Sequence, residues 1–187
     1  MNVIIVHGSF GKPFENWFPW AEKKLSEKGI VCTIPTFPTP NYQKYDDWKM
    51  LLNYYYERGY INEESVLVGH SCGAAFIVKY LVDCNIRVKG IVTVSGYNNF
   101  CSGDDMMDGL NFSFYQSHDE INKITSLVER RVSFFSDNDP FIPLEKLEEF
   151  AEEISAEKMQ IRNAGHFNAS AGYTDFEEVI KVLERFS

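Results

Sequence analysis

A serine flanked by two glycines, where an apolar run meets a helical pattern, constrains the fold of this chain more than any other feature. Residues 66–75 read VLVGHSCGAA, with Ser71 between Gly69 and Gly73. If the serine lies on a very sharp turn, side chains two positions to either side would collide with the neighbouring strand and helix, and glycine removes that collision. The segment therefore predicts a strand, a tight turn and a helix, with the Ser71 hydroxyl projecting from the turn.

The surroundings of this turn support the prediction. Three fixed positions alone would recur by chance in about 6% of chains this long. Upstream, residues 65–68 are short and apolar, as expected of a buried parallel strand. Downstream, apolar residues repeat at helical spacing, and these are Ala74, Ile77, Val78, Leu81 and Val82. A strand–turn–helix context is what a nucleophilic serine of this kind requires.

Strand-like and helix-like segments alternate along the whole chain. We expect strands near 2–7, 30–34, 65–69, 88–94, 131–136 and 157–162, and helices near 14–28, 45–59, 72–84, 118–129, 143–154 and 173–186. This alternation favours an α/β fold, a three-layer α/β/α sandwich around a mostly parallel six-stranded sheet. Nothing marks a domain boundary, so residues 1–187 are interpreted as a single domain that buries roughly 70% of its unfolded surface.

An activated serine needs a histidine base and an acid that orients it, and both types follow later strands. The acid must lie in a loop at the carboxyl end of a strand, and residues 131–136 run into such a loop. We favour Asp139 over Asp137 as the acid. The last strand, 157–162, is followed by the loop that carries His166, the predicted general base. His7 and His70 lie too close to their own turns and are interpreted as braces of the neighbouring loops.

The oxyanion that forms during acyl transfer needs two N–H donors. The residue after the nucleophile supplies one, which here is Cys72 through its backbone amide. The loop after the first strand supplies the other. That loop has the sequence HGSFG, and we favour the Ser9 amide, with Phe10 as the alternative.

Residues 97–117 follow a strand at the same edge and combine polar residues with scattered large apolar ones. Such a long connection is expected to line or partly cover a site. The substrate-binding residues predicted from these loops are Phe10, Ser95, Phe100 and Phe114. The segment is too short for a full lid, so we expect a shallow, open pocket for small soluble acyl substrates.

Taken together, these motifs resemble the small single-domain serine hydrolases of the YdeN-like and retinoblastoma-binding serine hydrolase family, within the α/β-hydrolase superfamily. The resemblance covers essentially the whole chain and rests on the segments VHG (6–8), NWFPW (16–20), IPTFP (34–38), DW (47–48), GHSCGA (69–74), DPFIP (139–143) and GHFN (165–168). It implies a triad of Ser71, Asp139 and His166 on a minimal α/β-hydrolase core, with strand order 2-1-3-4-5-6.

Composition argues against several partners and cofactors. A net charge of −9 opposes binding to nucleic acid and to anionic lipid. No apolar run approaches 18 residues, and the amino terminus enters a strand directly, so we expect no membrane association, no export and a cytoplasmic location. The spacing of Gly8 and Gly11 fits neither a phosphate loop nor a dinucleotide fingerprint, and Pro140 breaks a calcium-loop pattern. We therefore expect no cofactor and no metal, with the cysteines reduced.

The expected activity is acyl transfer from a small-molecule substrate to water, most simply as a carboxylesterase acting on short-chain esters. Thioester or small-peptide hydrolysis is an alternative. Another alternative is an interaction protein that keeps the fold without strong catalysis. The presence of all three triad residues and both glycines of the turn favours an enzyme. The sequence identifies no protein partner.

Overall fold

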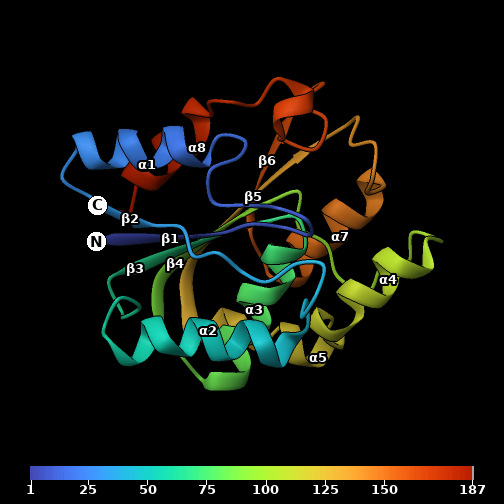
Figure 1. Cartoon of the computed structure of the whole chain (residues 1–187), viewed down its shortest axis with the longest axis horizontal. Coiled ribbons are helices and arrows are strands. Elements are labelled where there is room, and N and C mark those ends of the chain that lie inside the picture. Colours follow the sequence, from blue (N-terminus) through green and yellow to red (C-terminus); the bar gives the residue numbers. More distant parts are fainter. Residues whose placement is uncertain (187) are drawn as a thin grey trace.

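The computed structural model describes residues 1–186, and its centre is one six-stranded sheet (Figure 1). The strands are β1 (Asn2–Val6), β2 (Val31–Thr33), β3 (Ser65–His70), β4 (Val88–Val94), β5 (Val128–Ser136) and β6 (Glu157–Ile161). Their order is β2-β1-β3-β4-β5-β6, and every pair is parallel. The predicted α/β fold and strand order are confirmed, and the sheet is parallel throughout.

Helices cover both faces of the sheet (Figure 1). One face packs against α1 (Phe18–Glu27) and α8 (Glu177–Glu184), and the other packs against α2 (Tyr45–Glu57), α3 (Cys72–Cys84) and α7 (Leu144–Glu153). The alternation of side chains in β1 explains the two cores, because Val3 and Ile5 join the first and Ile4 and Val6 the second. No helix within residues 1–186 is long and apolar enough to cross a bilayer.

The structure differs from the expected helix over 118–129. Two single turns occupy this region, α5 (His118–Ile121) and α6 (Ile124–Leu127), and β5 begins at Val128. A capping box between Ser117 and Glu120 starts the first turn. Val128 pairs with Val88 of β4 in the sheet, so strand pairing takes residues that the sequence pattern placed in a helix.

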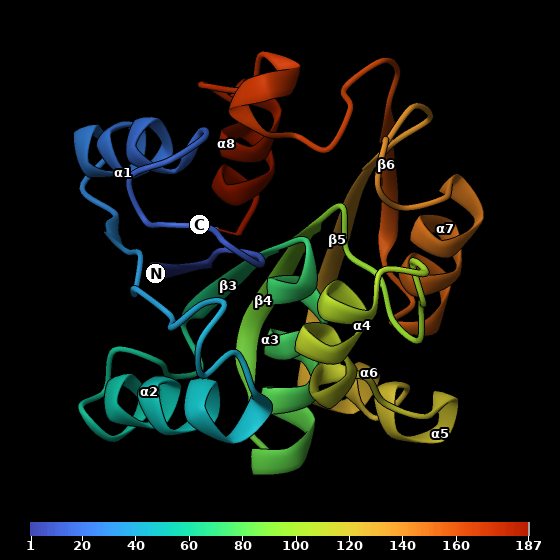
Figure 2. The same cartoon turned by 45° about the vertical axis from the view of Figure 1, so that its right-hand side comes forward.

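The segment 97–117 is also more ordered than a loop. It contains α4 (Asp105–Asn111), followed by a short 3-10 turn, Phe112–Phe114. Asp104 caps this helix, because its Oδ1 accepts hydrogen bonds from the amides of Met106 (2.9 Å) and Met107 (3.1 Å). Figure 2 shows α4 as a short helix drawn in front of α3.

Candidate active site

Ser71 lies between β3 and α3 in a backbone conformation that a non-glycine residue rarely adopts. Its φ is 57° and its ψ is −131°, and its amide donates to Val94 O at 2.8 Å. A Cβ atom at Gly69 would lie 2.6 Å from Ala74 Cα, and one at Gly73 would lie 2.5 Å from His7 O. The two glycines therefore permit the close approaches that the sharp turn requires, as the spacing predicted.

His166 and Asp139 form a close pair, and both oxygens of the carboxylate accept hydrogen bonds. His166 Nδ1 lies 2.7 Å from Asp139 Oδ2, which also accepts from Ser95 Oγ at 2.9 Å. Asp139 Oδ1 accepts from the amides of Phe141 (3.0 Å) and Ile142 (3.2 Å). Burial raises the pKa of this carboxyl, but the hydrogen bonds and the neighbouring His166 outweigh burial and lower the pKa below its ordinary value. Asp139 is therefore ionised at neutral pH.

The loop that carries His166 is fixed to the loop after β5. Three successive amides donate to three side chains of residues 136–138, namely Asn163 N to Asp137 Oδ1 (2.8 Å), Ala164 N to Ser136 Oγ (2.9 Å) and Gly165 N to Asn138 Oδ1 (2.8 Å). Asp137 thus supports the backbone of this loop, whereas Asp139 contacts the imidazole itself. This geometry agrees with the preference for Asp139 as the acid.

His70 connects the serine turn to the same loop. Its Nε2 lies 2.8 Å from His166 O, and since a carbonyl only accepts, Nε2 carries the proton. His70 is buried, and this burial, with the nearby His166, lowers its pKa to about 3. His70 is therefore a neutral link between β3 and the loop of His166, in keeping with its interpretation as a brace.

The burial of His70 predicts a loss of stability in acid. Between the ordinary pKa of about 6.5 and the folded value of about 3, the unfolded chain binds the extra proton, so stability falls as the pH falls. Each pH unit below about 6.5 costs up to about 1.4 kcal/mol. His70→Gln keeps a donor for His166 O but cannot titrate. Urea unfolding at pH 7 and pH 5 should show a loss about 2 kcal/mol larger in the wild type than in the variant. Equal losses would mean that His70 is not protonated on unfolding.

The predicted oxyanion residues lie together beside Ser71, with Ser9 Oγ 3.3 Å from Cys72 Sγ. Cys72 is the first residue of α3, where backbone amides have no intrahelical partner and the helix dipole favours negative charge. Within residues 1–186, neither the Ser9 nor the Cys72 amide donates to a backbone carbonyl. The Phe10 amide donates to Thr39 Oγ1 at 2.8 Å, whereas the Ser9 amide, which lies close to the Cys72 thiol, remains the predicted second donor. Burial raises the pKa of the Cys72 thiol to about 11, so it is protonated at neutral pH.

His7 supports the loop that carries Ser9. The Phe37 amide donates to His7 Nε2 at 3.0 Å, so the proton lies on Nδ1, which donates to Gly8 O at 2.8 Å. Burial lowers the pKa of His7 and favours the neutral ring. Both ring nitrogens of His7 are thus hydrogen-bonded, and His7 stabilises the backbone next to Ser9.

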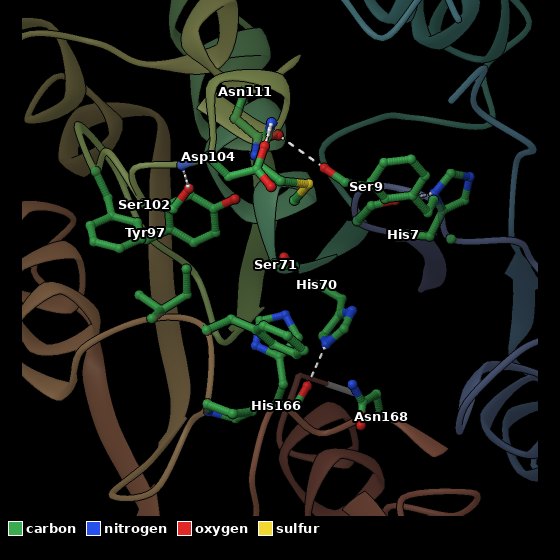
Figure 3. A pocket seen from close by; sticks show the side chains of 18 of the residues that line it. His7, Ser9, His70, Ser71, Tyr97, Ser102, Asp104, Asn111, His166 and Asn168 are labelled. Carbon is green, nitrogen blue, oxygen red and sulfur yellow. Dashed lines mark hydrogen bonds between the residues drawn. The ribbon is translucent and has the colours of Figure 1, made fainter. Parts of the chain in front are cut away.

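Residues of these loops line one cavity of about 640 Å³ (Figure 3). Its lining includes Ser71, His166 and Ser9, with a largely apolar wall of Phe18, Tyr97, Phe100, Met107, Tyr115, Phe141 and Ile142. Of the predicted substrate-binding residues, Phe10 and Phe100 line the cavity.

Two of the expected pocket residues lie elsewhere. Phe114 is fully buried against Trp48 and Phe76 in the core, because the 3-10 turn after α4 directs it toward the sheet. Ser95 is fully buried and donates to Asp139, so its hydroxyl supports the acid instead of facing a substrate. The position of Ser95 after β4 correctly placed it near the site, but only the structure gives its contact.

Ser71 and His166 line the same cavity (Figure 3). Among residues 1–186, however, no hydrogen bond joins Ser71 Oγ to His166 Nε2. Catalytic hydrogen bonds are often long without substrate and shorten in the reacting complex. The site therefore brings together a serine on a strained turn, a paired histidine and carboxylate, and the two residues predicted to hold an oxyanion.

Comparison with known proteins identifies the family of this chain. The putative hydrolase YdeN of Bacillus subtilis (strain 168) is 28% identical over 98% of this chain and 95% of its own length. The serine hydrolase RBBP9 of Rattus norvegicus is 24% identical over 97% of this chain and 92% of its own. The crystal structure of the B. subtilis ydeN gene product superposes with a TM-score of 0.86 at 27% identity, over 99% of this chain and 97% of that chain. Est1E from Butyrivibrio proteoclasticus shares the fold, with a TM-score of 0.71 at 13% identity over 99% of this chain and 86% of that chain. The family model described as serine hydrolase matches residues 3–185, and the chain belongs to this serine hydrolase family of the α/β-hydrolase superfamily.

Proposed function

We propose that this protein hydrolyses short-chain carboxylic esters, with Ser71 as nucleophile, His166 as general base and Asp139 as the residue that orients His166. The observation that carries the proposal is the 2.7 Å contact of His166 Nδ1 with the buried Asp139, in the cavity that Ser71 also lines. A carboxylate at Nδ1 keeps the proton there and leaves Nε2 free to accept the proton of the serine.

In the first half of the proposed reaction, Ser71 Oγ attacks the ester carbonyl and its proton passes to His166 Nε2. The carbonyl oxygen becomes an oxyanion that accepts hydrogen bonds from the Cys72 and Ser9 amides. The ionised Asp139 stabilises the imidazolium. Collapse of the intermediate breaks the bond to the alcohol, which takes the proton from His166 and leaves an acyl group on Ser71.

In the second half of the proposed reaction, water hydrolyses the acyl-enzyme by the same steps. His166 takes a proton from water, the hydroxide attacks the acyl carbonyl, and the same amides stabilise the oxyanion. Ser71 recovers its proton from His166 as the carboxylic acid leaves. Every proton transfer uses a residue of this chain, so the proposed route needs neither metal nor cofactor.

The cavity lining favours an uncharged acyl substrate. Its charged residues are Glu15, Asp104 and Asp108, and within residues 1–186 no lysine or arginine lines it. The apolar side chains of the wall offer contact area to an acyl chain, worth about 0.8 kcal/mol per buried CH₂. An anionic acyl group would gain no cationic partner and would meet carboxylates.

We expect kcat/KM for p-nitrophenyl esters to be highest for acyl chains of roughly two to six carbons. Each added CH₂ gains contact until the chain extends past the wall that Phe100 and Met107 provide, after which the gain of ~0.8 kcal/mol per group stops. The measurement is a steady-state series from acetate to laurate, with concentrations on both sides of each critical micelle concentration.

The same series separates the alternatives. A continuing rise through twelve carbons, or a jump in rate at the micelle threshold, would indicate a lipid-binding cap and contradict the short-chain proposal. A succinate monoester, matched to butyrate in chain length, should be the poorer substrate at low salt. Activity confined to thioesters or small peptides would show that these, and not carboxylic esters, are the substrates. No turnover of any acyl substrate would favour an interaction protein.

A further inference from the structure

A buried polar network lies behind the proposed oxyanion hole. Gln43 and Asn111 are 2% and 3% exposed, although most residues next to each in the sequence are exposed or half-buried. Gln43 Nε2 donates to Ser9 Oγ at 2.7 Å and to Asn111 Oδ1 at 2.9 Å, and Ser9 Oγ donates to Asn111 Oδ1 at 3.0 Å. Figure 3 shows Asn111 above Ser9, with the hydrogen bond between them. Three segments distant in sequence thus meet at one hydroxyl.

The network continues to the backbone of the loop after β1. Gln43 Oε1 accepts from Thr39 Oγ1 at 2.5 Å, and Thr39 Oγ1 accepts from the Phe10 amide at 2.8 Å. Gln43 thereby contacts the Ser9 side chain directly and the backbone amide of Phe10 through Thr39. Because the Ser9 side chain and the peptide that follows it are both held, rotation at Ser9 is restricted, and so is the orientation of the preceding peptide, which carries the Ser9 N–H.

Cys72, the other proposed oxyanion residue, contacts the same network. Cys72 Sγ lies 3.3 Å from Ser9 Oγ and 3.9 Å from Gln43 Nε2, and Cys72 is fully buried. The side chains of both residues whose amides would hold the oxyanion therefore contact the Gln43 group. Gln43 itself does not line the cavity, so it has no route to a substrate except through these residues.

We infer that Gln43 and Asn111 are positioning residues that set the direction of the Ser9 amide toward the oxyanion. This inference rests on the proposed function. It also links the segment 97–117 to catalysis, because Asn111 is the last residue of α4. A loss of either side chain should lower the rate of attack on a bound acyl or phosphonyl group, and a loss of the Gln43 side chain, which does not line the cavity, should leave the binding of that group unchanged.

The test is the reaction of Ser71 with a fluorophosphonate probe, in which the Ser71 Oγ–P bond forms, the P–F bond breaks, fluoride leaves and His166 takes the hydroxyl proton. Gln43→Met keeps the length of the side chain and removes its donor. Removal of a whole oxyanion donor costs 10²- to 10³-fold in other hydrolases, so misdirection of one should lower kinact about 10-fold or more. KI should change less than about twofold, because Gln43 does not contact the probe. Asn111→Leu should have a similar effect on kinact.

Asn98→Leu is the matched control. Asn98 is also a buried asparagine at the start of the 97–117 segment, and its hydrogen bonds go to the backbone of Gln116 and to Glu153 instead of Ser9. It should lower thermal stability yet leave kinact within about twofold of wild type. An equal loss of kinact in the Asn98 and Gln43 variants would show a general packing effect and overturn the inference.

If Gln43→Met does not fold, Ser9→Ala and Ser9→Thr replace it, because the first removes the hydroxyl that the network holds and the second keeps it. Loss of kinact in Ser9→Ala with recovery in Ser9→Thr supports the inference, and unchanged kinact in Ser9→Ala overturns it. Wild-type labelling at Ser71 with full kinact in the Gln43 and Asn111 variants rejects the positioning role and leaves the proposed function intact. If wild-type Ser71 is not labelled, the proposed function fails and this inference falls with it.

Discussion

Ser71→Ala is expected to abolish fluorophosphonate labelling and to lower kcat for ester hydrolysis by about 10⁵- to 10⁶-fold. The variant removes the only atom that would form the acyl-enzyme bond and leaves the rest of the site in place. Alanine has a Cβ like serine, so the strained φ of 57° remains and the turn keeps its shape. Stability should therefore change by less than about 0.5 kcal/mol.

The measurement is labelling followed by peptide mapping of the modified residue, with circular dichroism to compare folding. Ser126→Ala is the control, because Ser126 is exposed on α6 and, within residues 1–186, its hydroxyl donates only to Lys123 O. Labelling that persists in Ser71→Ala would assign the nucleophile to another residue. Ser9, which lines the same cavity, would then be the first residue to test for the label.

The sequence predicts the serine turn well because the turn is local. Gly69 and Gly73 are fixed by contacts with residues close in sequence or on the adjacent first strand, and their spacing is visible without any tertiary information. His166 and Asp139 are predictable for a different reason. Parallel strands all end at one edge of the sheet, so residues just past β5 and β6 must lie near the turn after β3.

The sequence is less informative where tertiary contacts determine the secondary structure or the direction of a side chain. The expected helix over 118–129 is broken because Val128 pairs with β4, a long-range contact that local periodicity does not report. Gln43 and Asn111 are single polar residues in segments with no repeat, and only folding brings both to Ser9. Phe114 resembles a pocket residue in sequence but packs in the core, because one turn of 3-10 helix determines which way it points.

Asp139→Asn is expected to lower kcat by about 10⁴-fold while Asp137→Asn lowers it only a few-fold. The surroundings of Asp139 determine which way the new amide must face. The Phe141 and Ile142 amides both donate to Oδ1, and they require an oxygen there. The NH₂ group is therefore placed at Oδ2, where it points at His166 Nδ1 and at Ser95 Oγ, which can turn to accept.

An NH₂ group at that position can only donate, so His166 Nδ1 must give up its proton and accept. The proton then lies on Nε2, and His166 can no longer take the proton of Ser71. The imidazolium also loses the adjacent negative charge that stabilises it during attack. Asp137 is a matched comparison, because its Oδ1 accepts from the Asn163 amide and an asparagine oxygen can do the same. Steady-state kinetics on p-nitrophenyl butyrate, with ¹⁵N NMR of the imidazole to identify the protonated nitrogen, would test both variants. A larger loss in Asp137→Asn, or a proton that stays on Nδ1 in Asp139→Asn, would mean that Asp139 does not set the tautomer of His166.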